Sequence, residues 1–159
     1  MEKEKSQERS SMTEVTKEIS LIDTNILVYA YDSADPKKQK IAKALLEKCW
    51  KRETIYAISA QNLAEFFVVV TQKIPNKMPL ENAEQIIKDI STFSNWNVLH
   101  YEEGTVQKAI ERYKEKKKHF WDAVIVETMK ENDIKHIYTE NEKDFEIFEE
   151  IKAINPFTE

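Results

Sequence analysis

Two spacings of apolar residues alternate along the chain. Short runs rich in β-branched and aromatic residues predict strands, and longer segments with apolar residues three or four positions apart predict amphipathic helices. The predicted strands are 19–23, 54–59, 96–101, 136–139 and 151–155; the predicted helices are one directly after residue 23, then 37–50, 60–73, 80–93, 102–117 and 120–131, with a helical turn at 145–150. Strands that alternate with helices predict an α/β fold with three layers, α/β/α, around a central, mostly parallel sheet of about five strands.

Length and composition favour one soluble domain. The chain has 159 residues, of which 41% are hydrophobic and 33% charged, enough for one core but short for two. Residues 1–17 are polar and lack the apolar centre of a signal peptide, so we expect a flexible leader followed by a single domain at 18–159. No apolar run approaches the roughly 18 residues of a membrane span, and we expect a cytoplasmic protein. Cys49, the single cysteine, is expected to pack in its helix rather than act as a nucleophile.

The charge pattern limits how the chain can meet nucleic acid. A net charge of −5 argues against binding by bulk electrostatics, which needs an excess of lysine and arginine. Basic clusters at 37–40, 48–52 and 114–118 can form a local basic rim, or they can be ordinary solvated helix faces. With one glycine, the chain has no glycine-rich loop for a dinucleotide or a nucleoside triphosphate.

Four acids stand at corresponding ends of the predicted elements. Asp23 ends the first strand and Asp144 follows a late strand, whereas Glu65 and Asp122 lie early in helices. In a parallel sheet with right-handed crossovers these ends share one edge, so the acids can converge; the alternative for Asp23 is a simple helix cap. Converging carboxylates repel one another unless a proton or a cation intervenes, and oxygen ligands favour Mg²⁺ or Mn²⁺. The three histidines are too scattered along the sequence to predict a histidine metal site.

Four segments carry a resemblance to a known family: IDTNILVYAYD (22–32), ISAQNLAEFF (58–67), FWDAVIVETM (120–129) and YTENEKDF (138–145). Together, from about residue 19 to the C-terminus, they resemble the PIN domain family, in particular the VapC-like toxins of toxin–antitoxin systems. The resemblance implies an acidic cluster of Asp23, Glu65, Asp122 and Asp144, supported by Thr24, Asn25 and Thr139. Asn141 departs from the pattern, because many members carry an acid there; others have asparagine and an acid three residues later, as in this chain.

The resemblance also implies a function. It predicts a metal-dependent ribonuclease, commonly a homodimer, that is the toxin of a toxin–antitoxin pair and is inhibited by a small antitoxin. In the mechanism that we expect, Asp23, Asp122 and Asp144 hold Mg²⁺ or Mn²⁺, while Glu65 binds metal or orients the attacking water. Exposed aromatic residues can bind RNA bases; for Trp121 we expect core packing instead, and for Tyr31 the pattern decides neither way. Glu127 faces away from Asp122 on their helix and is left out of the site.

Other functions remain open at this stage. A PIN-like fold without turnover would act as an RNA-binding or protein-binding module. A haloacid-dehalogenase-like phosphatase also carries an aspartate at the end of its first strand, but it needs a second one where this chain has Asn25. A phosphorylated receiver domain needs neighbouring acids and a strand-terminal lysine, which we cannot locate in the sequence.

Overall fold

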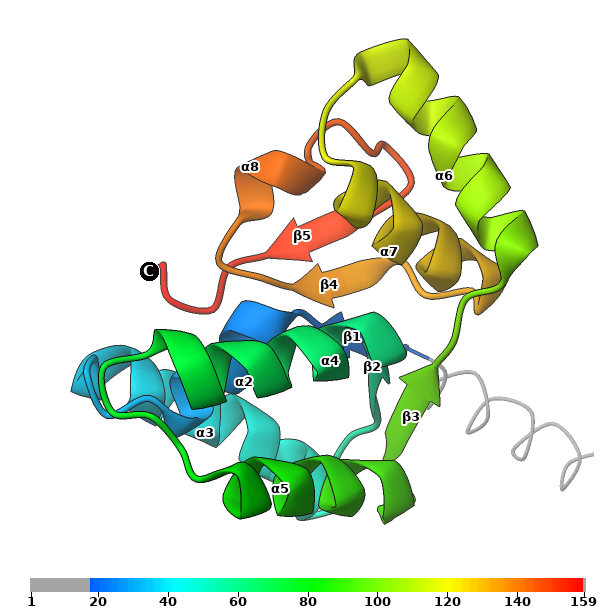
Figure 1. The fold of residues 1–159 in the computed structure, drawn as a ribbon. Helices are drawn as coiled ribbons and strands as arrows, with labels where there is room; N and C mark the ends of the chain where they lie inside the picture. Colours follow the sequence, from blue (N-terminus) through cyan, green and yellow to red (C-terminus); the bar gives the residue numbers. More distant parts are fainter. Residues whose placement is uncertain (1–17, 159) are drawn as a thin grey trace, which may run out of the picture.

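The computed structural model describes residues 18–158 (Figure 1), so the expected leader at 1–17 lies outside the described part of the chain. Its central sheet has five strands, all parallel, in the order β3-β2-β1-β4-β5. The elements are β1 (Ser20–Ile22), α2 (Thr24–Tyr31), α3 (Pro36–Trp50), β2 (Tyr56–Ser59), α4 (Ala60–Val68), the π-helix η1 (Val69–Lys73), α5 (Leu80–Thr92), β3 (Trp96–Leu99), α6 (Glu103–Lys116), α7 (Phe120–Glu131), β4 (His136–Tyr138), α8 (Glu142–Phe145) and β5 (Lys152–Ile154). The predicted fold class is confirmed.

Both faces of the sheet are covered, which gives the three layers (Figure 1). Neighbouring side chains of a strand point to opposite faces, so Leu21 packs with α6, α7 and α8, whereas Ile22 packs with the helices from α2 to α5. In β2, Ala57 and Ile58 divide in the same way. Because β1 and β2 pack on both faces of the sheet, apolar residues stand next to one another in them, at 21–22 and 56–58, rather than alternating with polar ones.

The strand order makes β1 the centre of the sheet. The chain runs outward from β1 to β2 and β3, and then returns to place β4 on the other side of β1. This reversal creates a crevice at the carboxyl ends of β1 and β4, where open α/β sheets bind their ligands. The Asp23 N–H, one residue beyond β1, donates to the Tyr138 carbonyl at 3.0 Å and fixes the strand end against β4.

Local sequence signals set the helix starts. Asp35 accepts a hydrogen bond from the Lys38 N–H at 3.1 Å, and Pro36 occupies the first turn of α3, where its missing N–H costs nothing. Ser59 and Asn62 form a reciprocal capping box at the start of α4. Cys49 is buried in α3, as predicted. None of the helices within residues 18–158 combines the length and the apolar character that crossing a membrane requires.

Two predicted segments differ from the structure. The helix expected at 60–73 is α-helical only to Val68 and continues as the π-helix η1. The change falls at the consecutive β-branched residues Val68, Val69 and Val70, whose side chains crowd a regular α-helix. The turn expected at 145–150 is wrong in position, because α8 covers Glu142–Phe145. The expected edge strand is β5, which pairs with β4 alone.

An ion-pair cluster joins α6, α7 and the segment before β5. The Arg112 guanidinium contacts the carboxylate of Glu127, which is only 5% exposed, and lies 2.6 Å from a carboxylate oxygen of Glu150. Arg112 lowers the pKa of Glu150 to about 2. A buried carboxylate that loses its only cationic partner carries a large desolvation cost.

We therefore expect Arg112→Met to lower the free energy of unfolding by about 3 kcal/mol in urea denaturation, since it leaves the Glu127 carboxylate buried without a cation. Lys114→Met is the matched control, because Lys114 pairs with Glu111 at the surface of the same helix. This control should change stability by less than about 1 kcal/mol. Equal effects of the two variants would contradict the importance of the Arg112 cluster.

Candidate active site

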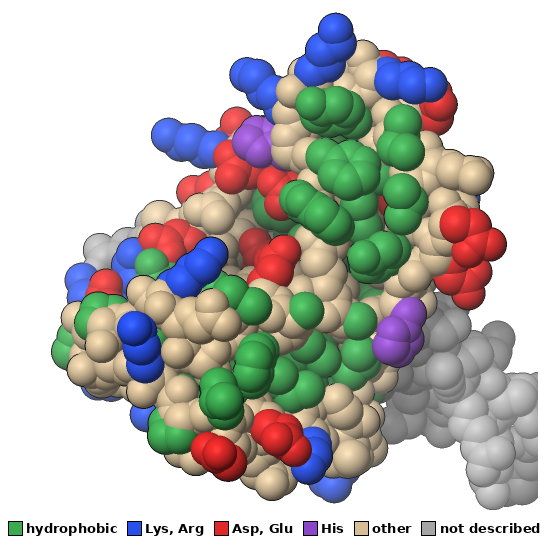
Figure 2. All heavy atoms as spheres, viewed as in Figure 1, with side chains coloured by type: hydrophobic (Ala, Val, Ile, Leu, Met, Phe, Trp, Pro, Cys, Tyr) green, Lys and Arg blue, Asp and Glu red, His purple; other side chains and the backbone are tan. Residues whose placement is uncertain are grey.

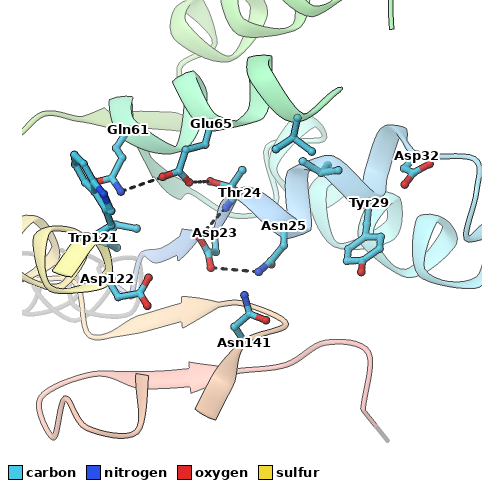
Figure 3. A pocket seen from close by; sticks show the side chains of 13 residues that line it. Asp23, Thr24, Asn25, Tyr29, Asp32, Gln61, Glu65, Trp121, Asp122 and Asn141 are labelled. Atoms are coloured by element: carbon cyan, nitrogen blue, oxygen red, sulfur yellow. Dashed lines mark hydrogen bonds between the residues drawn. The ribbon is translucent and has the colours of Figure 1, made fainter. Parts of the chain in front are cut away.

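The Asp23 carboxylate is the most deeply buried acid of the site, with 8% exposure. It caps α2 by accepting the Thr24 N–H at 2.8 Å on Oδ1. Its Oδ2 accepts a hydrogen bond from the Thr139 hydroxyl at 2.7 Å, directly beyond β4. The side-chain amide of Asn62 also donates to it at 3.3 Å, and that of Asn25 at 3.4 Å (Figure 3). Asp23 is thus both a helix cap and the centre of a polar network.

Glu65 is held at the mouth of the site from α4. Its Oε2 accepts the Thr24 hydroxyl at 2.9 Å, and its Oε1 accepts the side-chain amide of Gln61 at 3.2 Å (Figure 3). The Asn62 amide in turn donates to the Thr24 hydroxyl at 2.9 Å. Because both carboxylate oxygens have a donor, Glu65 has a fixed orientation beside Asp23 although it is exposed to solvent.

Asp122, Asp144 and His119 complete the site on the opposite side. Asp122 lies in the first turn of α7 and Asp144 in α8. The imidazole of His119 lies between them, with Nδ1 3.6 Å from Asp122 Oδ2 and Nε2 3.8 Å from Asp144 Oδ1. One ligand atom from each of the three residues lies within 4.8 Å of the others, an arrangement suited to a cation. His119 adopts a left-handed conformation with φ of 56°, a strained backbone that aims its ring at the acids.

The acids interact electrostatically as one group. Burial, together with the charges of Asp23, Asp144 and Glu65, raises the pKa of Asp122 to about 6, and His119 opposes the shift. Burial also raises the pKa of Asp23, against the hydrogen bonds from Thr139 and Thr24. Within residues 18–158, no lysine or arginine pairs with any of the four acids. Such a donor set fits Mg²⁺ or Mn²⁺, with His119 favouring the latter.

A cavity of about 360 Å³ opens beside the acids. Asp23, Glu65 and Asp122 line it, and it continues along α2 past Val28 and Tyr29. In Figure 2 this region is a hollow with acidic side chains inside and apolar side chains over the adjoining α6 and α7. Its size is that of a small-molecule site, large enough for one nucleotide unit of a substrate.

The predicted supporting residues all lie at this site. Thr24 bridges Glu65 and Asn62, and Thr139 bonds Asp23 directly. Asn25 accepts the Glu140 N–H at 3.2 Å, so it ties α2 to the loop after β4. Asn141 occupies the N-cap position of α8 without a side-chain capping bond and lines the cavity, while Asp144, three residues later, lies beside His119.

Three residues with clear contacts were missed by the sequence analysis. Asn62 and Gln61 lie about one helical turn before Glu65. The Gln61 amide donates to Glu65, and the Asn62 amide donates to Asp23 and Thr24. Their spacing from Glu65 was a signal that both face the same edge. His119 was dismissed because the histidines are scattered, although its position three residues before Asp122 in a helix start also predicts proximity.

The aromatic predictions have mixed outcomes. Core packing of Trp121 is wrong, because its side chain is 57% exposed and lines the cavity. Tyr31 packs edge to face on the buried Phe66, with ring centroids 5.8 Å apart. Of the two roles left open for Tyr31, core packing and RNA binding, the structure therefore favours core packing. Glu127 faces Arg112 and not the acids, in keeping with its omission from the site.

The fold and the site define a class: parallel α/β proteins with an acidic cluster at the carboxyl edge of the sheet. A family model described as the PIN domain matches residues 20–151, which include all four acids. The chain therefore belongs to the PIN domain family. No curated protein matches the sequence.

Solved structures with the same fold include a toxin–antitoxin complex from Klebsiella pneumoniae, at 23% identity over 86% of this chain and 97% of that chain, with a TM-score of 0.58. VapC20 of Mycobacterium tuberculosis, a sarcin–ricin loop cleaving toxin, has 19% identity over 75% of this chain and 86% of that chain, with a TM-score of 0.56. VapBC2 of Rickettsia felis, bound to a DNA fragment from its promoter, has 18% identity over 86% and 98%, with a TM-score of 0.57. At these identities the likeness concerns the fold.

The clustered charges should make the metal-free protein less stable than it would be without them. Asp122 has a folded pKa of about 6 against an ordinary value of 3.8, so ionising it costs more in the folded than in the unfolded protein, and at pH values above 6 the folded state carries this full cost. We expect Asp122→Asn in EDTA at pH 7.5 to raise the free energy of unfolding by about 2–3 kcal/mol, measured in urea.

The gain should shrink as the pH falls through the folded pKa, to roughly half at pH 5, because the wild-type carboxyl is then largely protonated in the folded state. Asp133→Asn is the control, since Asp133 is exposed beyond the far end of α7. A loss of stability for Asp122→Asn at pH 7.5, or a gain independent of pH, would contradict the electrostatic interpretation.

Proposed function

We propose that this PIN domain is a divalent-metal-dependent endoribonuclease and the toxin of a toxin–antitoxin pair. The observation that carries the proposal is the group of Asp23, Glu65 and Asp122 that line one cavity, with Asp144 next to it beside His119. No lysine or arginine of residues 18–158 is paired to any of these four acids. Such a cluster is stabilised by a cation, and a cation in an acidic site attracts the phosphate of a phosphodiester substrate.

The metal would be held by Asp23, Asp122 and Asp144, with His119 as a nitrogen ligand at the outer edge. The hydrogen-bond chain from Asn62 through Thr24 to Glu65 keeps a carboxylate oriented at the cavity mouth. From there Glu65 accepts a proton from the water whose oxygen bonds to phosphorus, or orients that water, while the P–O bond to the leaving ribose oxygen breaks and that oxygen takes a proton from solvent. When bound, Mg²⁺ or Mn²⁺ supplies Lewis acidity and neutralises the charge that develops on the substrate oxygens.

The partners belong to the same proposal. Toxins of similar fold are found in complexes with antitoxins, which supports a small antitoxin protein as a partner of this chain. Exposed apolar side chains, among them Val68 on α4 and Ile110 on α6, offer contact area for a second copy or an antitoxin. We propose that the protein is a homodimer in the cytoplasm. Light scattering of the purified protein tests the dimeric state.

We expect purified protein to cut a panel of labelled RNAs into discrete products when Mg²⁺ or Mn²⁺ is added, and to leave them intact in EDTA. Asp23→Asn and Asp122→Asn should lower the cleavage rate by about 100-fold or more, because each removes a charge that the cation needs. Asp133→Asn, outside the site, should cleave at the wild-type rate.

Products that persist at equal rates in both site variants would identify a contaminating nuclease and overturn the proposal. Binding of RNA without cleavage under any metal would favour the alternative, a catalytically silent binding module.

A further inference from the structure

The exposed Trp121 at the cavity edge has no structural explanation in the core. It is the second residue of α7, whose following residues from Ala123 to Met129 are all buried. Ile125, one turn later on the same side, is 3% exposed and forms part of the cavity wall, whereas Trp121 projects above it. A large aromatic ring kept in water beside an acidic site marks a binding surface.

The surroundings hold the indole in a defined place. Its ring makes an edge-to-face contact with Phe120, at 5.5 Å between centroids, and Phe120 makes a similar contact with Tyr113 on α6. In Figure 3 Trp121 lies beside Gln61, next to Glu65 and Asp122 at the open side of the site. The ring therefore rests against Phe120 and is accessible from the cavity.

The position fits one unit of a nucleic acid chain. Trp121 precedes the candidate ligand Asp122, so a phosphate at the acids places the neighbouring base within reach of the indole. Lys116, Lys117 and Lys118 lie three to five residues before Trp121, are all exposed, and form no ion pair within the part of the chain that the structure describes. Along the chain, the lysines are thus suited to contact the RNA backbone, the aromatic ring a base, and the metal-binding acids the reacting phosphate.

We propose that Trp121 is the residue that stacks an unpaired base next to the scissile phosphate, so that removing its ring weakens binding of single-stranded RNA and not of a duplex. This inference rests on the proposed function, because it assigns a neighbouring nucleotide to the same site. The net charge of −5 gives the chain little long-range attraction for RNA, and stacking supplies affinity that does not depend on net charge.

A protein partner is the competing occupant of this surface. Ile110 and Tyr113 are 40% and 41% exposed on the adjoining helix, and together with Trp121 they form an apolar patch. However, the lining of the acidic cavity includes Trp121 and neither of these two residues. A cavity of about 360 Å³ between acids accommodates a nucleotide unit better than an apolar protein surface, so RNA is favoured.

The test uses single-stranded RNA of about ten nucleotides and a duplex of the same sequence, both labelled, with the Asp23→Asn protein as the parent to prevent turnover. Adding Trp121→Leu should weaken single-strand binding by about 5- to 100-fold in fluorescence anisotropy, because leucine keeps apolar volume but removes the stacking face. Adding Trp121→Phe should cost less than about threefold, since phenylalanine still stacks. Duplex binding should be unchanged in both.

Tryptophan fluorescence gives a second readout. Trp96 is 4% exposed and Trp50 is partly buried, so quenching by single-stranded RNA should come from Trp121 and vanish in Trp121→Phe while binding persists. Circular dichroism and the thermal midpoint should be unchanged in each variant, because the replaced side chain is largely in solvent.

Unchanged single-strand binding in Trp121→Leu, or an equal loss for duplex RNA, would overturn the inference. A change in oligomeric state for both Trp121→Leu and Ile110→Ala, with RNA binding intact, would assign the patch to a protein contact instead. The outcome is separable from the nuclease proposal: a protein that cleaves RNA at the same rate with and without Trp121 refutes only stacking. RNA binding that depends on Trp121 without any cleavage refutes only the nuclease.

Discussion

The buried carboxylate of Asp23 is the constraint on which the site depends. A carboxylate with 8% exposure is tolerated only when hydrogen-bond donors replace water, and these donors come from α2, α4 and the segment after β4. Meeting that requirement brings Thr139 and Asn62 into contact with one residue, although they are far apart in sequence. The same network therefore fixes the register of β4 against β1 and the position of Glu65.

The site carries an electrostatic cost that the rest of the fold absorbs. Asp23, Glu65 and Asp122 line one cavity with Asp144 nearby, and burial with mutual repulsion holds the pKa of Asp122 near 6. The two covered faces of the sheet, with their separate cores, provide the stability that permits such a cluster. The turn before α7 adds local strain, because Lys117 and His119 both adopt left-handed conformations. That turn determines where α7 begins, and so the positions of His119, Trp121 and Asp122 at its first turn.

Sequence reasoning was strongest where a local pattern has one physical solution. The alternation of apolar strands with amphipathic helices predicted the covered parallel sheet, and the positions of Asp23 and Asp122 at element ends predicted their edge. It failed for Trp121, because helical periodicity identifies a helix's apolar side but not where the first turn extends beyond its packing partners. It also failed at 69–73, where a β-branched run becomes a π-helix beside the cavity.

The sequence by itself determined the type and order of the elements, the helix caps and the edge of the sheet at which the acids stand, because each follows from residues within a few positions of one another. Only the tertiary structure decided which donors hold Asp23, which oxygens of Glu65 are fixed, and that His119 lies between Asp122 and Asp144. These contacts join segments up to 116 residues apart. Their geometry depends on strand order and packing, which no local pattern encodes.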